Sequence, residues 1–262
     1  MAPPGAWATG RVLVVVAHPD DEVLGCGACL AAFRDARIVH VTDGAPRDGA
    51  DAARHGFAGR ADYAAARRRE AEAALALAGV PAARLASLGI GDQEASLNLV
   101  LAARALVPML AKADVVLTHA FEGGHCDHDA TAFAVHAARR LCGAKPDLFE
   151  MPFYYGDAQG WVRRRFLPHP DAGPISLRLL RPAERDRKAR MVAAHRTQAE
   201  TLRDFDLDRE DFRRAPAYDF LERPHDGPLL YERHGWNLDW PSWCARVAAA
   251  RTALDIEDAA CG

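Results

Sequence analysis

A histidine and three consecutive acidic residues follow an apolar run near the start of the chain. Residues 14–22 read VVVAHPDDE, and His18 and Asp21 are three positions apart. Imidazole and carboxylate are common zinc ligands, and a loop leaving a strand can point both side chains toward one metal ion. Asp20 would then stay free to take a proton from water. Alternatively, the three carboxylates only stabilise the N-terminus of the next helix.

A second group of histidines lies about a hundred residues later. Residues 118–128 read THAFEGGHCDH, with histidines at positions 119, 125 and 128. A catalytic zinc ion usually has three protein ligands and a water, so this segment could supply the third ligand. An H-x-x-H pair alone is only moderately specific, and a polar loop that caps a helix is the alternative. The two segments together are more specific than either one.

The predicted secondary structure places both segments at one edge of a sheet. Apolar runs predict strands at residues 11–17, 37–42, 84–90, 114–118, 147–153 and 175–180. Helices are predicted at residues 24–34, 63–78, 97–111, 130–141 and 183–203, and a long loop at residues 45–62. Alternating strands and helices indicate an α/β fold, a Rossmann-like three-layer sandwich with a mostly parallel central sheet. Ligand sites in such folds lie beyond the carboxyl ends of the strands.

The composition excludes several classes of protein. The chain has 262 residues, of which 50% are hydrophobic and 26% charged, and its formal net charge is −3. These values are typical of a soluble globular protein, and the charge argues against nucleic-acid binding. The apolar run at residues 12–17 is far shorter than the ~20 residues that span a membrane. Six cysteines without a disulfide pattern favour a reducing compartment, so we expect a cytoplasmic protein.

The two motifs resemble those of the LmbE/PIG-L family of zinc-dependent N-deacetylases. The resemblance rests on AHPDDE at residues 17–22 and HCDHDA at residues 125–130. It extends to four shorter matches, TDG (42–44), R-x-x-E (67–70), LGIGDQ (88–93) and HRTQ (195–198). It implies an LmbE-like fold, and we expect a catalytic α/β domain over residues 1–203 with a C-terminal extension, residues 204–262, packed on it.

The resemblance also implies a role for each motif residue. The zinc ligands would be His18, Asp21 and His128, with one zinc ion per chain. Asp20 would be the general base for a zinc-activated water that attacks an acetamide carbonyl, and His125 would stabilise the oxyanion or protonate the leaving amine. Two further residues would support the site: Asp127 behind the histidines, and Glu22 as a helix cap or a brace of the loop.

Five residues are candidate contacts of a sugar substrate: Asp43, Arg67, Asp92, His195 and Gln198. Turn chemistry is the alternative role of Asp43 and Asp92, and a solvated i,i+3 pair with Glu70 is the alternative role of Arg67.

Two positions depart from the family pattern. Cys126 replaces the usual proline and is expected to pack as a small apolar side chain or to act as a rival zinc ligand. Gly123 stands where some members have a tyrosine.

The resemblance implies a small N-acetylated amino sugar or glycoconjugate as the substrate. A metal-dependent amidase with a non-sugar substrate is one alternative. A non-catalytic nucleotide-binding or interaction module is another, but Gly25 and Gly27 lack the third glycine of a dinucleotide-binding loop.

Cys26 and Cys29 form an isolated C-x-x-C, which we interpret as two buried small residues. Three tryptophans of the C-terminal region are a weak indication of sugar binding, at positions 236, 240 and 243.

Overall fold

Strand β1 (Arg11–Val16) is almost entirely buried, as its run of β-branched residues predicts. Alternate side chains of a strand point to opposite faces of the sheet. Leu13 and Val15 therefore enter one hydrophobic core, whereas the valines at positions 12, 14 and 16 enter a second core on the other face. The structure, a computed structural model, describes residues 7, 9–236 and 238–256.

Six further strands complete the central sheet: β2 (Asp35–Pro46), β3 (Leu85–Asp92), β4 (Val115–His119), β5 (Asp147–Met151), β8 (Ser176–Leu179) and β9 (Arg209–Arg214). Their order is β3-β2-β1-β4-β5-β9-β8. Strands β1 to β5 are parallel, and β9 and β8 are added antiparallel at one side. A separate hairpin consists of β6 (Tyr154–Gly156) and β7 (Trp161–Arg163).

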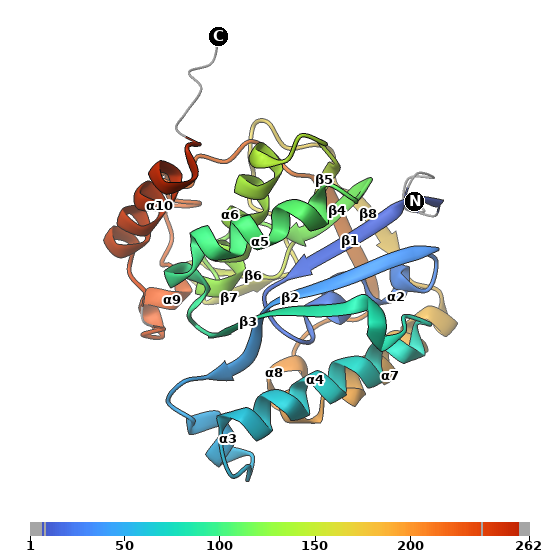
Figure 1. The fold of residues 1–262 in the computed structure, drawn as a ribbon. Helices are drawn as coiled ribbons and strands as arrows, with labels where there is room; N and C mark the ends of the chain where they lie inside the picture. The colour runs from blue at the N-terminus through green and yellow to red at the C-terminus, as the bar shows by residue number, and fades with distance from the viewer. Residues whose placement is uncertain (1–6, 8, 237, 257–262) are drawn as a thin grey trace.

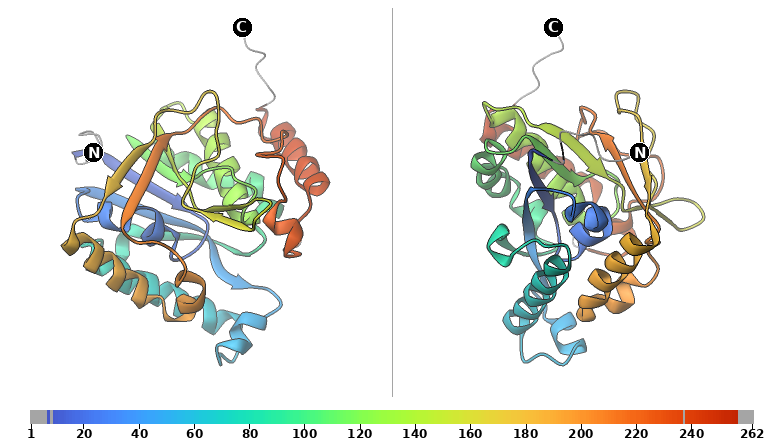
Figure 2. Two further views of the ribbon diagram at one scale, coloured as in Figure 1. Left: turned by 180° about the vertical axis from the view of Figure 1, so that it is seen from behind. Right: turned by 90° about the vertical axis from the view of Figure 1, so that its right-hand side faces the viewer.

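Helices cover both faces of this sheet, which confirms the predicted three-layer α/β fold (Figure 1). One face carries α5 (Leu99–Leu110), α6 (Cys126–Leu141) and α10 (Trp240–Leu254). The other face carries α2 (Asp21–Leu30), α4 (Arg60–Leu77) and α7 (Pro182–Ala194). Figure 2 shows the same layers from behind and from one side. Short helices are α3 (Ala50–Arg54), α8 (Ala199–Leu202) and α9 (Leu230–Arg233).

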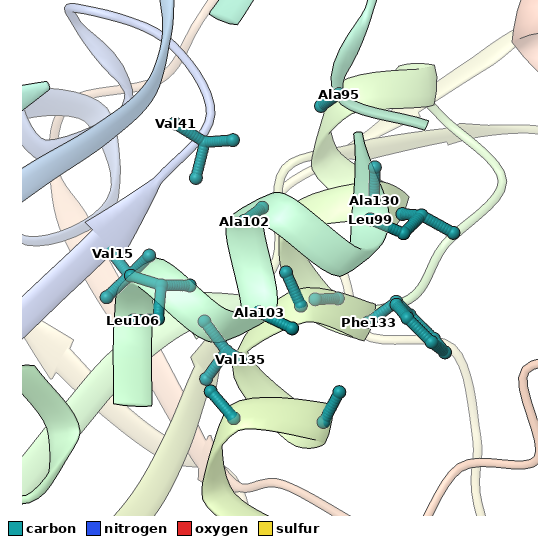
Figure 3. Close-up of a cluster of buried hydrophobic side chains, with 14 of the residues drawn as sticks. Val15, Val41, Ala95, Leu99, Ala102, Ala103, Leu106, Ala130, Phe133 and Val135 are labelled. Carbon is teal, nitrogen blue, oxygen red and sulfur yellow. The ribbon is translucent and has the colours of Figure 1, made fainter. Parts of the chain in front are cut away.

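Small residues let α5 and α6 approach each other closely over the sheet. Figure 3 shows Ala102 and Ala103 of α5 in the cluster that also contains Phe133 of α6. Val15 and Val41 contribute to this cluster from the sheet. Ala130, near the start of α6, belongs to the same cluster as Val15 of β1, so this packing holds the beginning of α6 over the sheet beside the site.

The predicted helix at residues 24–34 begins earlier, at Asp21, because acidic residues stabilise a first helical turn. The helix predicted at 130–141 begins at Cys126, because the His125 side chain accepts the N–H of Asp127 and caps it. Both extensions place Asp21 and His128 inside first helical turns, whereas His18 precedes α2 and His125 caps α6.

Two other predictions about secondary structure were wrong. Residues 45–62 do not form a long loop, because β2 extends to Pro46, α3 follows, and α4 begins at Arg60. The helix predicted at 183–203 ends at Ala194, where His195 leaves helical geometry at φ −83° and ψ 69°. A single 3₁₀ turn and α8 continue the chain.

The C-terminal region is tied to the rest of the molecule by a strand and a helix. Strand β9 lies between β5 and β8 in the central sheet, and α10 packs on α5. Trp243 of α10 is fully buried, and its Nε1 donates to the Phe220 carbonyl at 2.8 Å. The division of the chain at residue 203 stays a prediction. Within residues 7, 9–236 and 238–256, every helix is too short or too polar to span a bilayer.

Helix α2 is interrupted at Cys26, whose φ of −142° and ψ of 17° are not helical. The Glu210 carboxylate accepts the freed N–H groups of residues 28 and 29 at 2.7 and 3.1 Å. Lys188 donates to the Leu24 carbonyl at 2.7 Å and pairs with Glu210 at 3.0 Å. The side chains of Lys188 and Glu210 are fully buried. This ion pair thus replaces helical hydrogen bonds that the interruption removes.

Replacing Lys188 with methionine should destabilise the protein. Glu210 would keep its buried charge without its nearest cation, so the free energy of unfolding should fall by ~3 kcal/mol. Urea unfolding followed by circular dichroism measures this loss. Lys145 is exposed, and Lys145→Met should change the free energy by less than ~0.5 kcal/mol. Equal unfolding midpoints for the two variants would show that the pair does not support α2.

Candidate active site

The order of the strands reverses beside β1, with β2 and β3 on one side and β4 and β5 on the other. Such a reversal opens a crevice at the carboxyl ends of the strands on its two sides, here β1 and β4. The segments that follow β1 and β4 meet there. The ring centroid of His18 is 4.5 Å from that of His125 and 5.3 Å from that of His128. The structure therefore brings together the two motifs identified in the sequence.

Asp21 lies between imidazole rings at the centre of this crevice. Its Oδ2 is 3.3 Å from Nδ1 of His18, and its Oδ1 is 3.4 Å from Nε2 of His128. Ligand atoms of these three residues lie within 4.8 Å of one another, and all three residues are buried. In the described part of the chain the ion pairs of Asp21 are all with histidines. Two imidazoles and a carboxylate without an Arg or Lys partner fit a zinc ion.

His119, the last residue of β4, also belongs to the crevice, although the sequence analysis assigned it no role. Its Nε2 accepts the Ala17 N–H at 2.9 Å and lies 3.4 Å from Oδ2 of Asp21. Its ring stacks on His128, with centroids 4.0 Å apart and planes at 16°. His119 therefore links β4 to β1 and supports the ring of His128. Its position at the end of a predicted strand was the signal that could have identified it.

Asp20 has different partners from Asp21, and its backbone has a φ of 140°. Its Oδ2 accepts a hydrogen bond from Nη2 of Arg67 at 2.9 Å, and its N–H donates to Glu22 Oε2 at 3.1 Å. Burial raises the pKa of Asp20 to about 8, against the opposing charge of Arg67. Glu22 also pairs with Nε2 of His40 at 3.0 Å. Glu22 was predicted to be a helix cap or a brace of the loop, and its contacts with Asp20 and His40 fit a brace.

Arg67 is buried at 4% exposure, so the solvated pair with Glu70 is wrong. Its Nη1 donates to the Gly44 carbonyl at 2.6 Å while Nη2 holds Asp20. Glu70 instead accepts from the Thr197 hydroxyl at 2.6 Å. Gly44 has a φ of 66°, and a Cβ there would collide with the guanidinium. The packing of α4 on β2 thus places a cation beside Asp20.

His125 presents one defined nitrogen to the crevice. Its Nδ1 accepts the Asp127 N–H at 3.1 Å, so a neutral ring carries its proton on Nε2. Burial, and then the charge of His18, lower the pKa of His125 well below its usual range. Nε2 lies 4.0 Å from Oδ1 of Asp92. The neutral ring is thus a hydrogen-bond donor toward the cavity.

Asp127 and Asp92 lie on the other side of His18. Both carboxylates are 3.2 Å from its Nε2, as expected of a support for a ligand histidine. Asp127 also accepts the N–H groups of residues 93 and 95, at 2.6 and 3.0 Å. Burial raises the pKa of Asp127 to about 6. Although burial also acts on Asp92, the charge of His18 lowers the pKa of that carboxyl below its usual range.

A cavity of about 100 Å³ opens over these groups. Of the five predicted sugar contacts, Arg67, Asp92 and Gln198 line it. Asp43 and His195 do not. Asp43 accepts the Ala45 N–H at 3.0 Å and pairs with Arg60, so it stabilises a turn, its alternative role. His195 is only 1% exposed, because α7 ends just before it and the backbone turns its side chain into the protein interior.

Tyr154 of β6 lines the cavity too, although no motif indicated it. Its ring centroid lies 5.2 Å from that of His128. Burial, and then Asp21 and Asp20, raise the pKa of its hydroxyl well above the usual range. Oε2 of Glu122 accepts the N–H groups of residues 153 and 154, at 2.9 and 3.3 Å, and so positions this segment. Some members of the family have a tyrosine at the position of Gly123. In this chain the tyrosine in the cavity is Tyr154, which comes from β6.

Cys126 packs as a small apolar residue. It is fully buried in the core that contains α5 and α6. Burial raises the pKa of its thiol well above the usual range, and the thiol belongs to neither group of potential metal ligands among the described residues. Cys26 and Cys29 are likewise buried in the opposite core.

A larger cavity, of about 500 Å³, lies at the opposite edge of the sheet. It is lined by the amino-terminal ends of β1, β2 and β3 and the end of α5. The metal-ligand groups found in the described residues are not in it, and parallel sheets carry their sites at the other edge. The smaller cavity is therefore the candidate active site.

Comparison with known proteins agrees with the motifs. Residues 13–139 match the family described as PIG-L: GlcNAc-PI de-N-acetylase. No curated protein sequence matches the chain. Among solved structures, A40926 pseudoaglycone deacetylase Dbv21 is 24% identical, with a TM-score of 0.61, and the match covers 78% of this chain and 96% of that one.

Two other solved structures share the fold. The zinc-inhibited form of teicoplanin deacetylase Orf2 is 17% identical, with a TM-score of 0.61 and coverage of 80% and 99%. N,N'-diacetylchitobiose deacetylase from Pyrococcus horikoshii is 19% identical, with a TM-score of 0.57 and coverage of 79% and 84%. These matches confirm the resemblance to the LmbE/PIG-L family and the LmbE-like fold.

The backbone of Asp20 predicts a difference between two substitutions. A φ of 140° is strained for any residue with a Cβ and open to glycine. Asp20→Gly should therefore be about 1 kcal/mol more stable than Asp20→Ala. Both variants remove the carboxylate from Arg67, so that loss cancels in the comparison. Thermal and urea unfolding measure the difference, and an alanine variant of equal or higher stability would contradict the strain.

Proposed function

We propose that this PIG-L-like chain is a zinc-dependent hydrolase that removes the acetyl group from an N-acetylated amino sugar or glycoconjugate. The products would be acetate and a free amine. The observation that carries the proposal is the convergence of His18, Asp21 and His128, with the carboxylate of Asp20 in the same cavity but paired with Arg67. The matching family, a de-N-acetylase, and the three solved structures named above, which are described as deacetylases, support the same reaction.

His18, Asp21 and His128 would hold one zinc ion per chain. A second group of potential ligands adds Asp92, Asp127 and His125 to His18. Both oxygens of Asp127 accept backbone N–H groups, and Nδ1 of His125 accepts another. The first group has fewer such commitments and is therefore the better ligand set. When bound, zinc would polarise an acetamide carbonyl and make hydroxide available near neutral pH.

Asp20 is the proposed general base. It is buried beside the ligand group, and Arg67 holds its Oδ2 in one position. A carboxylate that accepts a proton from water becomes a neutral acid. It could then return the proton to the leaving amine, so one side chain would serve both steps.

His125 and Tyr154 are the proposed donors to the oxyanion. The neutral His125 ring offers Nε2–H to the cavity because Asp127 N–H occupies Nδ1. Tyr154 lines the same cavity, and its raised pKa keeps the hydroxyl protonated. Fixed donors of this kind stabilise charge that develops on a carbonyl oxygen. His125 is then a donor, and the amine receives its proton from Asp20.

The nucleotide-binding alternative gains no support from the site. A phosphate would bind at the N-terminus of α2, and that position holds three buried acidic residues, at positions 20, 21 and 22. Repulsion between these carboxylates and a phosphate disfavours such a ligand.

The function is tested by metal content and acetate release together. Purified protein with one equivalent of zinc should release acetate from N-acetylglucosamine or its glycosides. Dialysis against a chelator should remove the activity, and added zinc should restore it. Failure to release acetate from any N-acetylated substrate would contradict a deacetylase, and full activity in metal-free protein would contradict the role of zinc.

Two variants separate the base from a ligand. Asp20→Asn should keep about one zinc ion per chain and lower kcat by ~10²–10⁴-fold, because the amide cannot accept the proton. His128→Ala should lower the zinc content itself, since a ligand is lost. Atomic absorption gives the metal content, and an acetate assay gives the rate. An Asp20→Asn variant with wild-type kcat would remove Asp20 as the base.

A further inference from the structure

We propose that four partly exposed rings beside the cavity bind a second ring of the substrate. The inference rests on the proposed function and deepens it, because it makes the substrate a glycoside in place of a free amino sugar. The four rings are called the aromatic platform and belong to Tyr154, Trp161, His234 and Trp236. The second ring would be a pyranose or an aromatic group, since both stack flat on aromatic side chains.

The platform begins at the reactive groups themselves. Trp236 lies 4.7 Å from the ring of His125, and Tyr154 lies 5.2 Å from the ring of His128. Trp161 joins the two sides, with centroids 5.0 Å from Tyr154 and 6.4 Å from Trp236. The rings therefore form one contiguous group that begins at the two histidines.

The rings of the platform are accessible. Trp161 is 38% exposed, His234 is exposed, and Tyr154 and Trp236 are half-buried. Trp243 of the same C-terminal region is fully buried in the core, so the partial exposure of the platform is not a general property of that region. The hairpin β6–β7 and the segment after α9 are distant in sequence, and only the fold brings their rings together.

The size of the cavity explains why a platform is needed. Pockets that enclose a drug-sized ligand measure ~300–1,000 Å³, and the cavity measures about 100 Å³. It can hold an acetamido group, whereas the sugar ring and its substituent must lie outside. The part of the substrate outside would contact the surface around the cavity, to which the platform is joined through Tyr154.

A cation lies at the outer edge of the platform. The guanidinium carbon of Arg163 is 5.2 Å from the Trp161 ring and 5.9 Å from the Phe205 ring. Asp204 lies 3.9 Å from this guanidinium. Such a cation–π contact fixes the orientation of the indole, and the side chain offers N–H groups to hydroxyls of a bound ring. The chemistry fits a flat ring with polar edges.

The test compares substrates with one and two rings. N-acetylglucosamine has one ring, N,N'-diacetylchitobiose adds a pyranose, and phenyl N-acetylglucosaminide adds an aromatic ring. Wild-type enzyme should have a KM at least about tenfold lower for one or both two-ring substrates. Trp161→Ala should reduce this preference about five- to tenfold, and Trp161→Phe should restore most of it.

Trp240→Ala is the matched control. Trp240 is half-buried on α10 and contacts Arg223 instead of the platform, so this variant should keep the wild-type preference. If Trp161→Ala raises the KM for N,N'-diacetylchitobiose, the second ring is a pyranose. If it raises the KM for phenyl N-acetylglucosaminide, the second ring is aromatic. Equal KM values for one-ring and two-ring substrates in the wild type would overturn the proposal, as would a preference that Trp161→Ala leaves intact.

Calorimetry separates this proposal from the proposed function. Zinc-loaded Asp20→Asn should bind the preferred two-ring ligand about tenfold more tightly than N-acetylglucosamine, whether or not the wild type releases acetate. Acetate release without that difference in affinity would overturn the platform and leave the deacetylase standing. The reverse result would support the platform and contradict the deacetylase.

Discussion

The burial of three consecutive acidic side chains after β1 is the constraint on which the site depends. Asp20, Asp21 and Glu22 are at most 5% exposed, and a buried charge without a partner costs several kcal/mol. Arg67 pairs with the first, histidines surround the second, and His40 pairs with the third. Helix α4, strands β2 and β4, and helix α6 must therefore converge on this turn.

The same turn separates two carboxylates that differ by one position in the sequence. Asp20, at a positive φ, is held by Arg67, whereas Asp21 begins α2 and pairs with imidazoles. The Glu22 carboxylate accepts the Asp20 N–H and holds this shape. One carboxylate is thus available to a metal ion while its neighbour stays free to exchange a proton, as metal-assisted hydrolysis requires.

The groups proposed for the reaction and the rings proposed for recognition come largely from different parts of the chain, and Tyr154 belongs to both. The candidate metal ligands follow β1 and β4, whereas Tyr154, Trp161 and Trp236 come from the β6–β7 hairpin and the segment after α9. The central fold can then support one reaction while the later segments select the substrate. The small volume of the cavity supports this division, because it has room for an acetamido group and little else.

The sequence by itself determined the α/β class and the two motifs that follow β1 and β4, because hydrophobic periodicity and the alternation of strands and helices along the chain are local signals. It also indicated Asp20 and Asp21 as carboxylates with separate roles. Only the tertiary structure decided that Arg67 holds Asp20, that His119 supports His128, and that Tyr154 enters the cavity. These contacts join residues far apart in the chain, and no local pattern encodes a distance between two elements. Buried pairing and ring packing therefore became visible only once the layers were assembled.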